Sequence, residues 1–115
     1  MRAIVIFARS PQREALAKGL RVETAAPLFR SFTAMWLRAA QHAGAQPIVA
    51  CDDGALRDIA PDVDRMHIAQ RGATFGERAA NAAADAFARG FTHVLLAAID
   101  APPAEIGEAF DALER

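Results

Sequence analysis

Short apolar runs alternate along this chain with longer segments of helical periodicity. Residues 3–8 (AIVIFA) are continuously apolar with β-branched residues at the centre, which is typical of a strand covered by helices on both faces. Further runs at 46–51, 93–99 and, more weakly, 65–69 predict three more strands. Because strands that alternate with helices usually form parallel sheets, we predict an α/β fold: a three-layer sandwich around a mostly parallel, Rossmann-like sheet of about four strands, with 3–8 at its centre.

The helical segments are marked by periodicity and by their ends. Apolar residues recur at i, i+3, i+4 and i+7 over 27–42, with Thr24 as a candidate N-cap and Gly44 as the stop. An alanine-rich segment at 75–89 predicts a second helix, which Gly90 closes. Both helices are long enough to cover a face of the sheet.

Composition limits what kind of protein this is. A chain of 115 residues with 53% hydrophobic and 23% charged residues fits one globular domain and argues against disorder. The formal net charge of -1 gives no global attraction to nucleic acid or to an anionic membrane. Cys51 is the single cysteine, which excludes an internal disulfide framework, and the first apolar run is too short for a signal peptide or a membrane span. We expect a soluble, cytoplasmic protein.

The first candidate site follows the first strand. In an open parallel sheet, ligands bind beyond the carboxyl ends of the strands. The segment after residue 7 places cations and a hydroxyl at such an end, where they can hold phosphate oxygens through charge-assisted hydrogen bonds. The candidate nucleotide-binding residues here are Ala8, Arg9, Ser10, Pro11 and Lys18. A solvated basic loop is the competing interpretation, since the segment has neither a P-loop nor a G-x-G-x-x-G pattern.

The second candidate site is the stretch QRGATFGER at 70–78. Two glycines at the start of a helix let backbone N–H groups approach a ligand closely, near the positive end of the helix dipole. Its candidate nucleotide-binding residues are Gln70, Gly72, Gly76, Glu77 and Arg78. A capping box formed by Thr74 and Glu77 is the structural alternative, and it accounts for Glu77 without a ligand.

Acidic residues follow two other strands. Asp100 comes directly after the last predicted strand, where a carboxylate can hold Mg²⁺ or Mn²⁺ on a diphosphate, or can cap a helix that opens at Pro102 or Pro103 and runs to Leu113. The carboxylates of the run 52–54 (DDG) can hold a divalent cation or a ribose hydroxyl, but the run is more typical of a turn, here into a short helix that Pro61 ends.

Taken together, FARSP after the first strand and QRGATFGERAANAAADAFARGFTHVLLAAIDAP later in the chain resemble a bacterial glycosyltransferase-like family associated with arsenosugar biosynthesis, within the nucleotide-diphospho-sugar transferases. The resemblance implies the nucleotide-binding half of a GT-A-type fold. The residues that match its motifs are Phe7, Ala8, Arg9, Pro11, Gln70, Gly72, Gly76, Glu77, Arg78, Asp100 and Pro102.

The chain also departs from that family. Ala17-Lys18-Gly19 stands where the family has a lysine-threonine-arginine cluster, and Glu14 replaces a loop glycine. The resemblance therefore implies one domain over 1–115 that lacks the C-terminal acceptor half. The function expected is a nucleotide-sugar transferase, glycosyl or nucleotidyl, that binds a nucleotide or nucleotide sugar with a divalent ion. The alternative is a non-catalytic remnant that serves as a binding module. An uncovered edge strand would favour a homodimer.

Overall fold

A four-stranded parallel sheet forms the centre of the molecule. The computed structural model describes residues 1–9, 11–51, 66–98, 103 and 106–115. Its strands are β1 (Arg2–Phe7), β2 (Ala45–Cys51), β3 (Met66–Ala69) and β4 (His93–Ala98). They lie in the order β3-β2-β1-β4, and each neighbouring pair is parallel. The predicted fold class is confirmed, with β1 in the interior of the sheet as expected.

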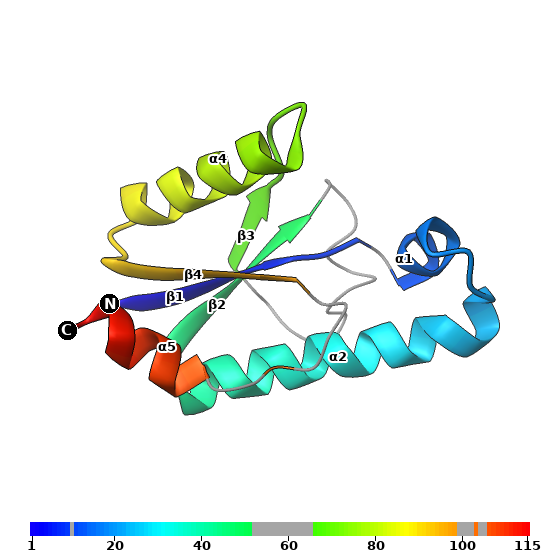
Figure 1. The fold of residues 1–115 in the computed structure, drawn as a ribbon, viewed down its shortest axis with the longest axis horizontal. Helices are drawn as coiled ribbons and strands as arrows, with labels where there is room; N and C mark the ends of the chain where they lie inside the picture. The colour runs from blue at the N-terminus through cyan, green and yellow to red at the C-terminus, as the bar shows by residue number, and fades with distance from the viewer. Residues whose placement is uncertain (10, 52–65, 99–102, 104–105) are drawn as a thin grey trace.

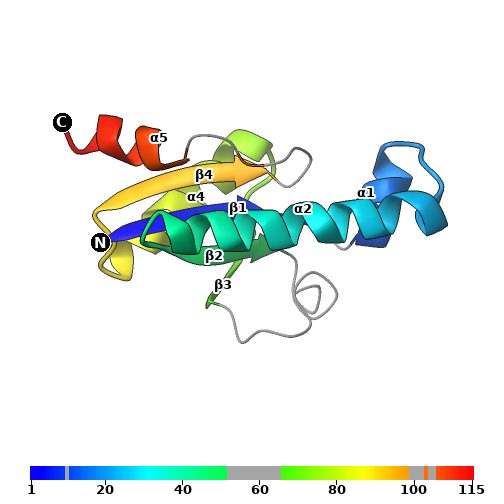
Figure 2. The ribbon, with the colours of Figure 1, turned by 90° about the horizontal axis from the view of Figure 1, so that it is seen from below.

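Helices cover both faces of this sheet. They are α1 (Pro11–Ala17), α2 (Val22–His42), α4 (Phe75–Ala88) and α5 (Ile106–Leu113). Figure 1 shows α4 on one face and α2 with α5 on the other, which makes three layers. Figure 2 shows α2 running along the sheet and past it to α1, beyond the carboxyl ends of the strands. The helix α1 therefore stands at the end of the sheet where ligands of such folds bind.

The strand β1 buries side chains in both layers. Ile4 and Ile6 belong to the core beneath α2 and α5, together with Phe29 and Phe110. Ala3, Val5 and Phe7 belong to the core beneath α4. Since successive side chains of a strand point to opposite faces, the continuous apolar run at 3–8 is what a strand between two helical layers requires.

The beginning of α2 corrects one prediction. The helix begins at Val22, with Arg21 at the cap position and no side-chain capping bond, so Thr24 is not the N-cap. Ala25 and Ala26 are buried, and Ala25 shares a core cluster with Ala15 of α1. This packing extends the helix past Pro27, because tertiary contacts outweigh local propensity.

The remaining predicted elements have mixed outcomes. The helix α1 lies in a segment where no helix was predicted. The last helix is described from Ile106, and Pro103 lies outside it, so it does not open at that proline. The turn at 52–54 and the short helix ending at Pro61 lie outside the described residues. Within the part of the chain that the structure describes, no helix is long and apolar enough to cross a membrane.

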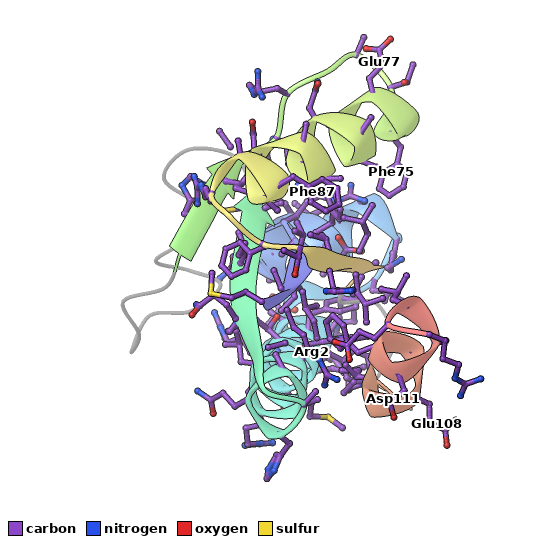
Figure 3. The ribbon with its side chains drawn as sticks, turned by 90° about the vertical axis from the view of Figure 1, so that its left-hand side faces the viewer. Arg2, Phe75, Glu77, Phe87, Glu108 and Asp111 are labelled. Carbon is purple, nitrogen blue, oxygen red and sulfur yellow. The ribbon has the colours of Figure 1, made fainter. Side chains whose placement is uncertain are left out.

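Contacts of Arg2 hold the C-terminal helix α5 and the residues after it against the amino end of the sheet. Its Nε and Nη2 donate to the two carboxylate oxygens of Glu114 at 2.7 and 2.8 Å, and Nη1 donates to the carbonyl oxygen of Ala43 at 2.9 Å. The guanidinium also lies 5.2 Å from the ring centroid of Phe110. Figure 3 shows Arg2 facing α5, which carries Asp111 and Glu108. This end of the molecule is structural and lies opposite the candidate site.

Candidate functional site

A cavity of about 630 Å³ opens at the carboxyl ends of the strands. This volume lies within the range of small-molecule sites, roughly 300–1,000 Å³. The residues that line it come from the ends of β1 and β4, from α1, and from the loop and first turn of α4. The described lining consists of Phe7, Ala8, Arg9, Glu14, Lys18, Gln70, Gly72, Phe75, Arg78 and Ala98. Two segments far apart in the sequence, 7–18 and 70–78, thus form one site.

Positive charge dominates the described lining, with one carboxylate among the cations. Arg9 and Lys18 lie on either side of Glu14: Arg9 Nε is 2.9 Å from Oε2, and Lys18 Nζ is 3.3 Å from Oε1. Glu14 is only 5% exposed, whereas half of the Arg9 side chain is exposed. The helix α1 creates this arrangement, since Lys18 follows its last residue directly and lies one turn beyond Glu14.

Arg78 is the third cation of the cavity. It projects from the first turns of α4, and its Nε is buried without a hydrogen-bond partner among the described residues. A buried, unpaired donor costs free energy, more so when it is charged. Because Arg78 lines the cavity, a turn of its side chain toward a bound anion would give this atom an acceptor.

Gln70 ties the ends of three strands together beneath the cavity. Its Nε2 donates to the carbonyl oxygen of Ala50 at 2.9 Å and lies 3.5 Å from that of Ala8, while its backbone N–H donates to Cys51. These contacts fix where β1 and β2 end relative to the loop after β3. Gln70 therefore has a structural role in addition to its place in the lining.

Gly72 brings the loop backbone against the beginning of α4. A Cβ at this position would lie 2.7 Å from Glu77 Cβ and 2.9 Å from the backbone nitrogen of Arg78. Its φ of 135° is also one that other residues rarely adopt. The glycine is thus required by the packing of the loop, and the resulting close approach leaves the backbone at the cavity wall.

The cap of α4 follows the prediction with one difference. Thr74 Oγ1 accepts a hydrogen bond from the Glu77 backbone at 3.1 Å, so Thr74 is the N-cap. The Glu77 carboxylate accepts from the N–H of Ala73 at 2.8 Å, one residue before the position of a regular capping box. Figure 3 shows Glu77 pointing away from the sheet and Phe75 pointing toward the rest of the molecule.

Two aromatic rings complete the described wall. Phe7 and Phe75 have ring centroids 5.5 Å apart at an interplanar angle of 57°. Phe7 is buried, but Phe75 is 60% exposed. An exposed ring at the rim of a cationic cavity offers a face on which a planar group can stack.

The structure places the predicted site residues in three groups. The cavity brings together Ala8, Arg9, Lys18, Gln70, Gly72 and Arg78. Gly76 and Glu77 lie between Phe75 and Arg78 in the first turn of α4, outside the described lining. Ser10, Asp100 and the side chain of Pro11 lie outside what the structure describes, so their roles stay predictions.

Sequence reasoning missed Glu14, Phe7, Phe75 and Ala98 as lining residues. Pro11 at the first position of α1, followed by Ala15 facing the core, was the available signal for a helix that turns Glu14 inward. The described residues hold no group of three or more His, Cys, Asp or Glu side chains that fits a metal ion. The one described carboxylate of the cavity is already held by two cations.

The fold has a counterpart among solved structures. The structure of a "putative nucleotide-diphospho-sugar transferase" from Desulfovibrio desulfuricans matches the whole chain with a TM-score of 0.77 at 24% sequence identity. The chain spans 56% of the length of that protein. No protein-family model and no curated protein matches the chain. At this identity the likeness establishes the fold alone, an α/β fold with a parallel sheet between layers of helices.

Proposed function

We propose that the cavity binds the diphosphate of a nucleotide or nucleotide sugar, and that the chain supplies the donor-binding part of a transferase of the glycosyl or nucleotidyl type. One observation carries the proposal: Arg9 and Lys18 from one segment of the chain and Arg78 from another line one cavity at the carboxyl end of a parallel sheet. Cations gathered at such an edge suit the oxygens of a diphosphate.

Different residues of the cavity lining suit the phosphates and the base of the proposed ligand. The phosphates lie between Arg78 and the Arg9–Lys18 pair, and the Arg78 side chain turns toward them so that its Nε gains the acceptor it lacks within the described chain. The absence of a side chain at Gly72 lets the backbone approach them. The base stacks on the exposed face of Phe75, a contact worth about 1–3 kcal/mol per base at comparable sites.

The proposal includes a divalent ion, for which Asp100 is the predicted ligand. The carboxylate follows β4, whose last residue, Ala98, lines the cavity. When bound, Mg²⁺ or Mn²⁺ would supply positive charge for the diphosphate. Arg9, Lys18 and Arg78 line the same cavity, so such an ion would add to the charge that they provide for the diphosphate.

The sequence resemblance supports the more specific part of the proposal, which is the type of reaction. The motifs around Arg9, Gln70 and Asp100 resemble the glycosyltransferase-like family associated with arsenosugar biosynthesis. Glycosyl transfer from a nucleotide sugar is therefore the reaction type that we favour. A solved structure at 24% identity supports the fold beneath that proposal and leaves the sugar and acceptor open.

A binding module without transfer is the second candidate function. Glu14 favours it, since its carboxylate already holds Arg9 and Lys18, two of the cations that a diphosphate needs. A remnant of the fold that retains nucleotide binding would show affinity for the nucleotide and no hydrolysis or transfer of a nucleotide sugar.

Calorimetric titration with uridine, guanosine and cytidine diphosphates tests the proposal. The wild-type chain should bind at least one of them. Arg78→Gln should weaken that binding about tenfold or more, because hydrogen bonds to charged groups contribute about 1.5–3 kcal/mol. Its thermal stability should stay the same or rise, since the change removes a buried donor that has no partner in the described protein.

Controls separate the site from the rest of the surface. Arg30→Gln, an exposed cation of α2 outside the described lining, should leave affinity unchanged. Phe75→Leu should weaken nucleotide binding without affecting pyrophosphate, and Asp100→Asn with and without Mg²⁺ reports on the ion. No binding at millimolar nucleotide, or equal affinity in Arg78→Gln, would reject the proposal.

A further inference from the structure

Glu14 stands out among the side chains that the proposed function leaves unexplained. It is a charged residue that is 5% exposed, at the wall of a cavity that otherwise presents cations. Its two oxygens contact two different cations, Arg9 and Lys18. Lone buried carboxylates are uncommon, and this one is compensated entirely by groups that line the same cavity.

We propose that Glu14 is a built-in counter-ion of the cavity, which competes with the ligand's phosphates for Arg9 and Lys18 and so sets how tightly anionic ligands bind. The inference rests on the proposed function, because it assumes that phosphates enter this cavity. It identifies one residue of the protein, Glu14, as a determinant of the affinity for anionic ligands.

The geometry favours competition between Glu14 and the phosphates over a role in which Glu14 only holds the two cations in place. The Arg9 contact to Glu14 uses Nε, at 2.9 Å, and the Lys18 contact uses the ammonium itself, at 3.3 Å. A phosphate that bonds to both cations must come close to the carboxylate between them. Like charges at such a distance repel, and carboxylate and phosphate seek the same donors.

The exposure of the two cations shows how they reach a ligand. The side chains of Arg9 and Lys18 are 52% and 37% exposed, while that of Glu14 is 7% exposed. The carboxylate is therefore more buried than the cations, and a phosphate that takes the Nε–H of Arg9 or the N–H of Lys18 that faces Glu14 competes with it. Neutralising Glu14 should remove both the repulsion and this competing bond.

Glu14→Gln isolates the charge. Glutamine has nearly the same shape and keeps an oxygen that accepts from Arg9 Nε. The variant should bind pyrophosphate at least about tenfold more tightly than wild type, because like-charge contacts at binding sites cost several kcal/mol. Affinity for uridine, which carries no phosphate, should not change. Glu23→Gln, an exposed carboxylate of α2 outside the described lining, is the matched control.

Each outcome of this titration decides something. Tighter pyrophosphate binding by Glu14→Gln alone supports the counter-ion. Equal affinity, or weaker binding by the folded variant, overturns it, and weaker binding would assign Glu14 to holding Arg9 in place. If neither protein binds pyrophosphate or a nucleotide, the proposed function fails and this inference fails with it.

A measurement on the wild-type chain covers the case in which Glu14→Gln does not fold. The Nε–H proton of Arg9 reports on the ion pair with Glu14 by NMR, because this nitrogen lies 2.9 Å from Glu14 Oε2. Saturation with pyrophosphate should shift this resonance as the ion pair weakens. A resonance that stays unchanged while the ligand binds would overturn the inference.

Discussion

At the scale of single residues, Gly72 illustrates what the sequence reveals and what it leaves out. The glycine was singled out as a place where backbone approaches a ligand. The structure gives a further reason for it, because the missing Cβ also makes room for Glu77 and Arg78 at the beginning of α4. A sequence shows that a glycine is present, but the atoms that a side chain would meet depend on the folded loop.

Gly72→Ala should lower the free energy of unfolding by about 1–3 kcal/mol, the cost of a residue held in a glycine-only conformation. The Cβ clash at 2.7 Å adds to that strain. Chemical denaturation monitored by circular dichroism measures the change. Gly107→Ala is the control: nothing lies within 4 Å of its Cβ, and a helical position favours alanine. A Gly72→Ala variant that is as stable as wild type would contradict the loop conformation described for Gly72.

Glu114 gives a residue-scale prediction with a pH dependence. The hydrogen bonds from Arg2 lower the pKa of Glu114 below its ordinary value of 4.5, and burial only partly opposes this. A lowered pKa means that the stabilisation is present above about pH 4.5 and is lost as the pH falls through the folded-state value. Glu114→Gln should therefore destabilise the protein at pH 7, and the difference should shrink in acid.

Urea denaturation at pH 7 and at pH 3 measures that difference. Glu108→Gln, which changes an exposed carboxylate in the first turn of α5, should change stability less at both pH values. A Glu114→Gln effect that is as large at pH 3 as at pH 7 would show that the carboxylate charge is not what stabilises this end of the molecule.

At the scale of elements, periodicity predicted the strands and the two long helices but not α1. The segment 11–17 has few apolar residues, and its helix forms because Ala15 packs on α2, whose own beginning is extended by Ala25. Neither α1 nor the beginning of α2 has a local sequence signal as strong as Gly44 and Gly90, which mark the ends of the two long helices. Glu14 was consequently seen only as a departure from a family motif, and its burial between Arg9 and Lys18 was not predictable.

The edge strand β4 carries a prediction about assembly. Among the described strands it pairs only with β1, and Leu96, 45% exposed, lies on the same face as Val94, which packs under α4. Phe87 of α4 is also exposed, at 52%. Because an unpaired apolar edge can pair with the same edge of a second copy around a two-fold axis, we predict a homodimer through β4.

Size-exclusion chromatography with light scattering tests this dimer. Wild type should have twice the mass of the chain, and Leu96→Lys should be monomeric. Leu113→Lys, an exposed leucine of α5, is the matched control and should remain dimeric. A monodisperse wild-type monomer would contradict the prediction.

At the scale of the whole molecule, the layers were predictable and the cavity was predictable only in part. A strand that is apolar at every position requires helices on both faces, and 3–8 met that requirement with Ile4 on one side and Val5 on the other. The carboxyl-end rule then located Arg9, Gln70 and Arg78 near one another. Their common cavity, and the rings and carboxylate within it, depend on tertiary packing that no local pattern encodes.

Chemical-shift mapping of the isotope-labelled chain tests the central claim most directly. Uridine, guanosine and cytidine diphosphates are each added with Mg²⁺, and amide resonances are followed to saturation. At least one nucleotide should shift the resonances of Ala8, Gln70, Gly72, Phe75 and Ala98, while those near Arg2 and Glu114 at the opposite end stay in place. An absence of shifts at millimolar nucleotide, or shifts confined to that opposite end, would contradict a nucleotide site in this cavity.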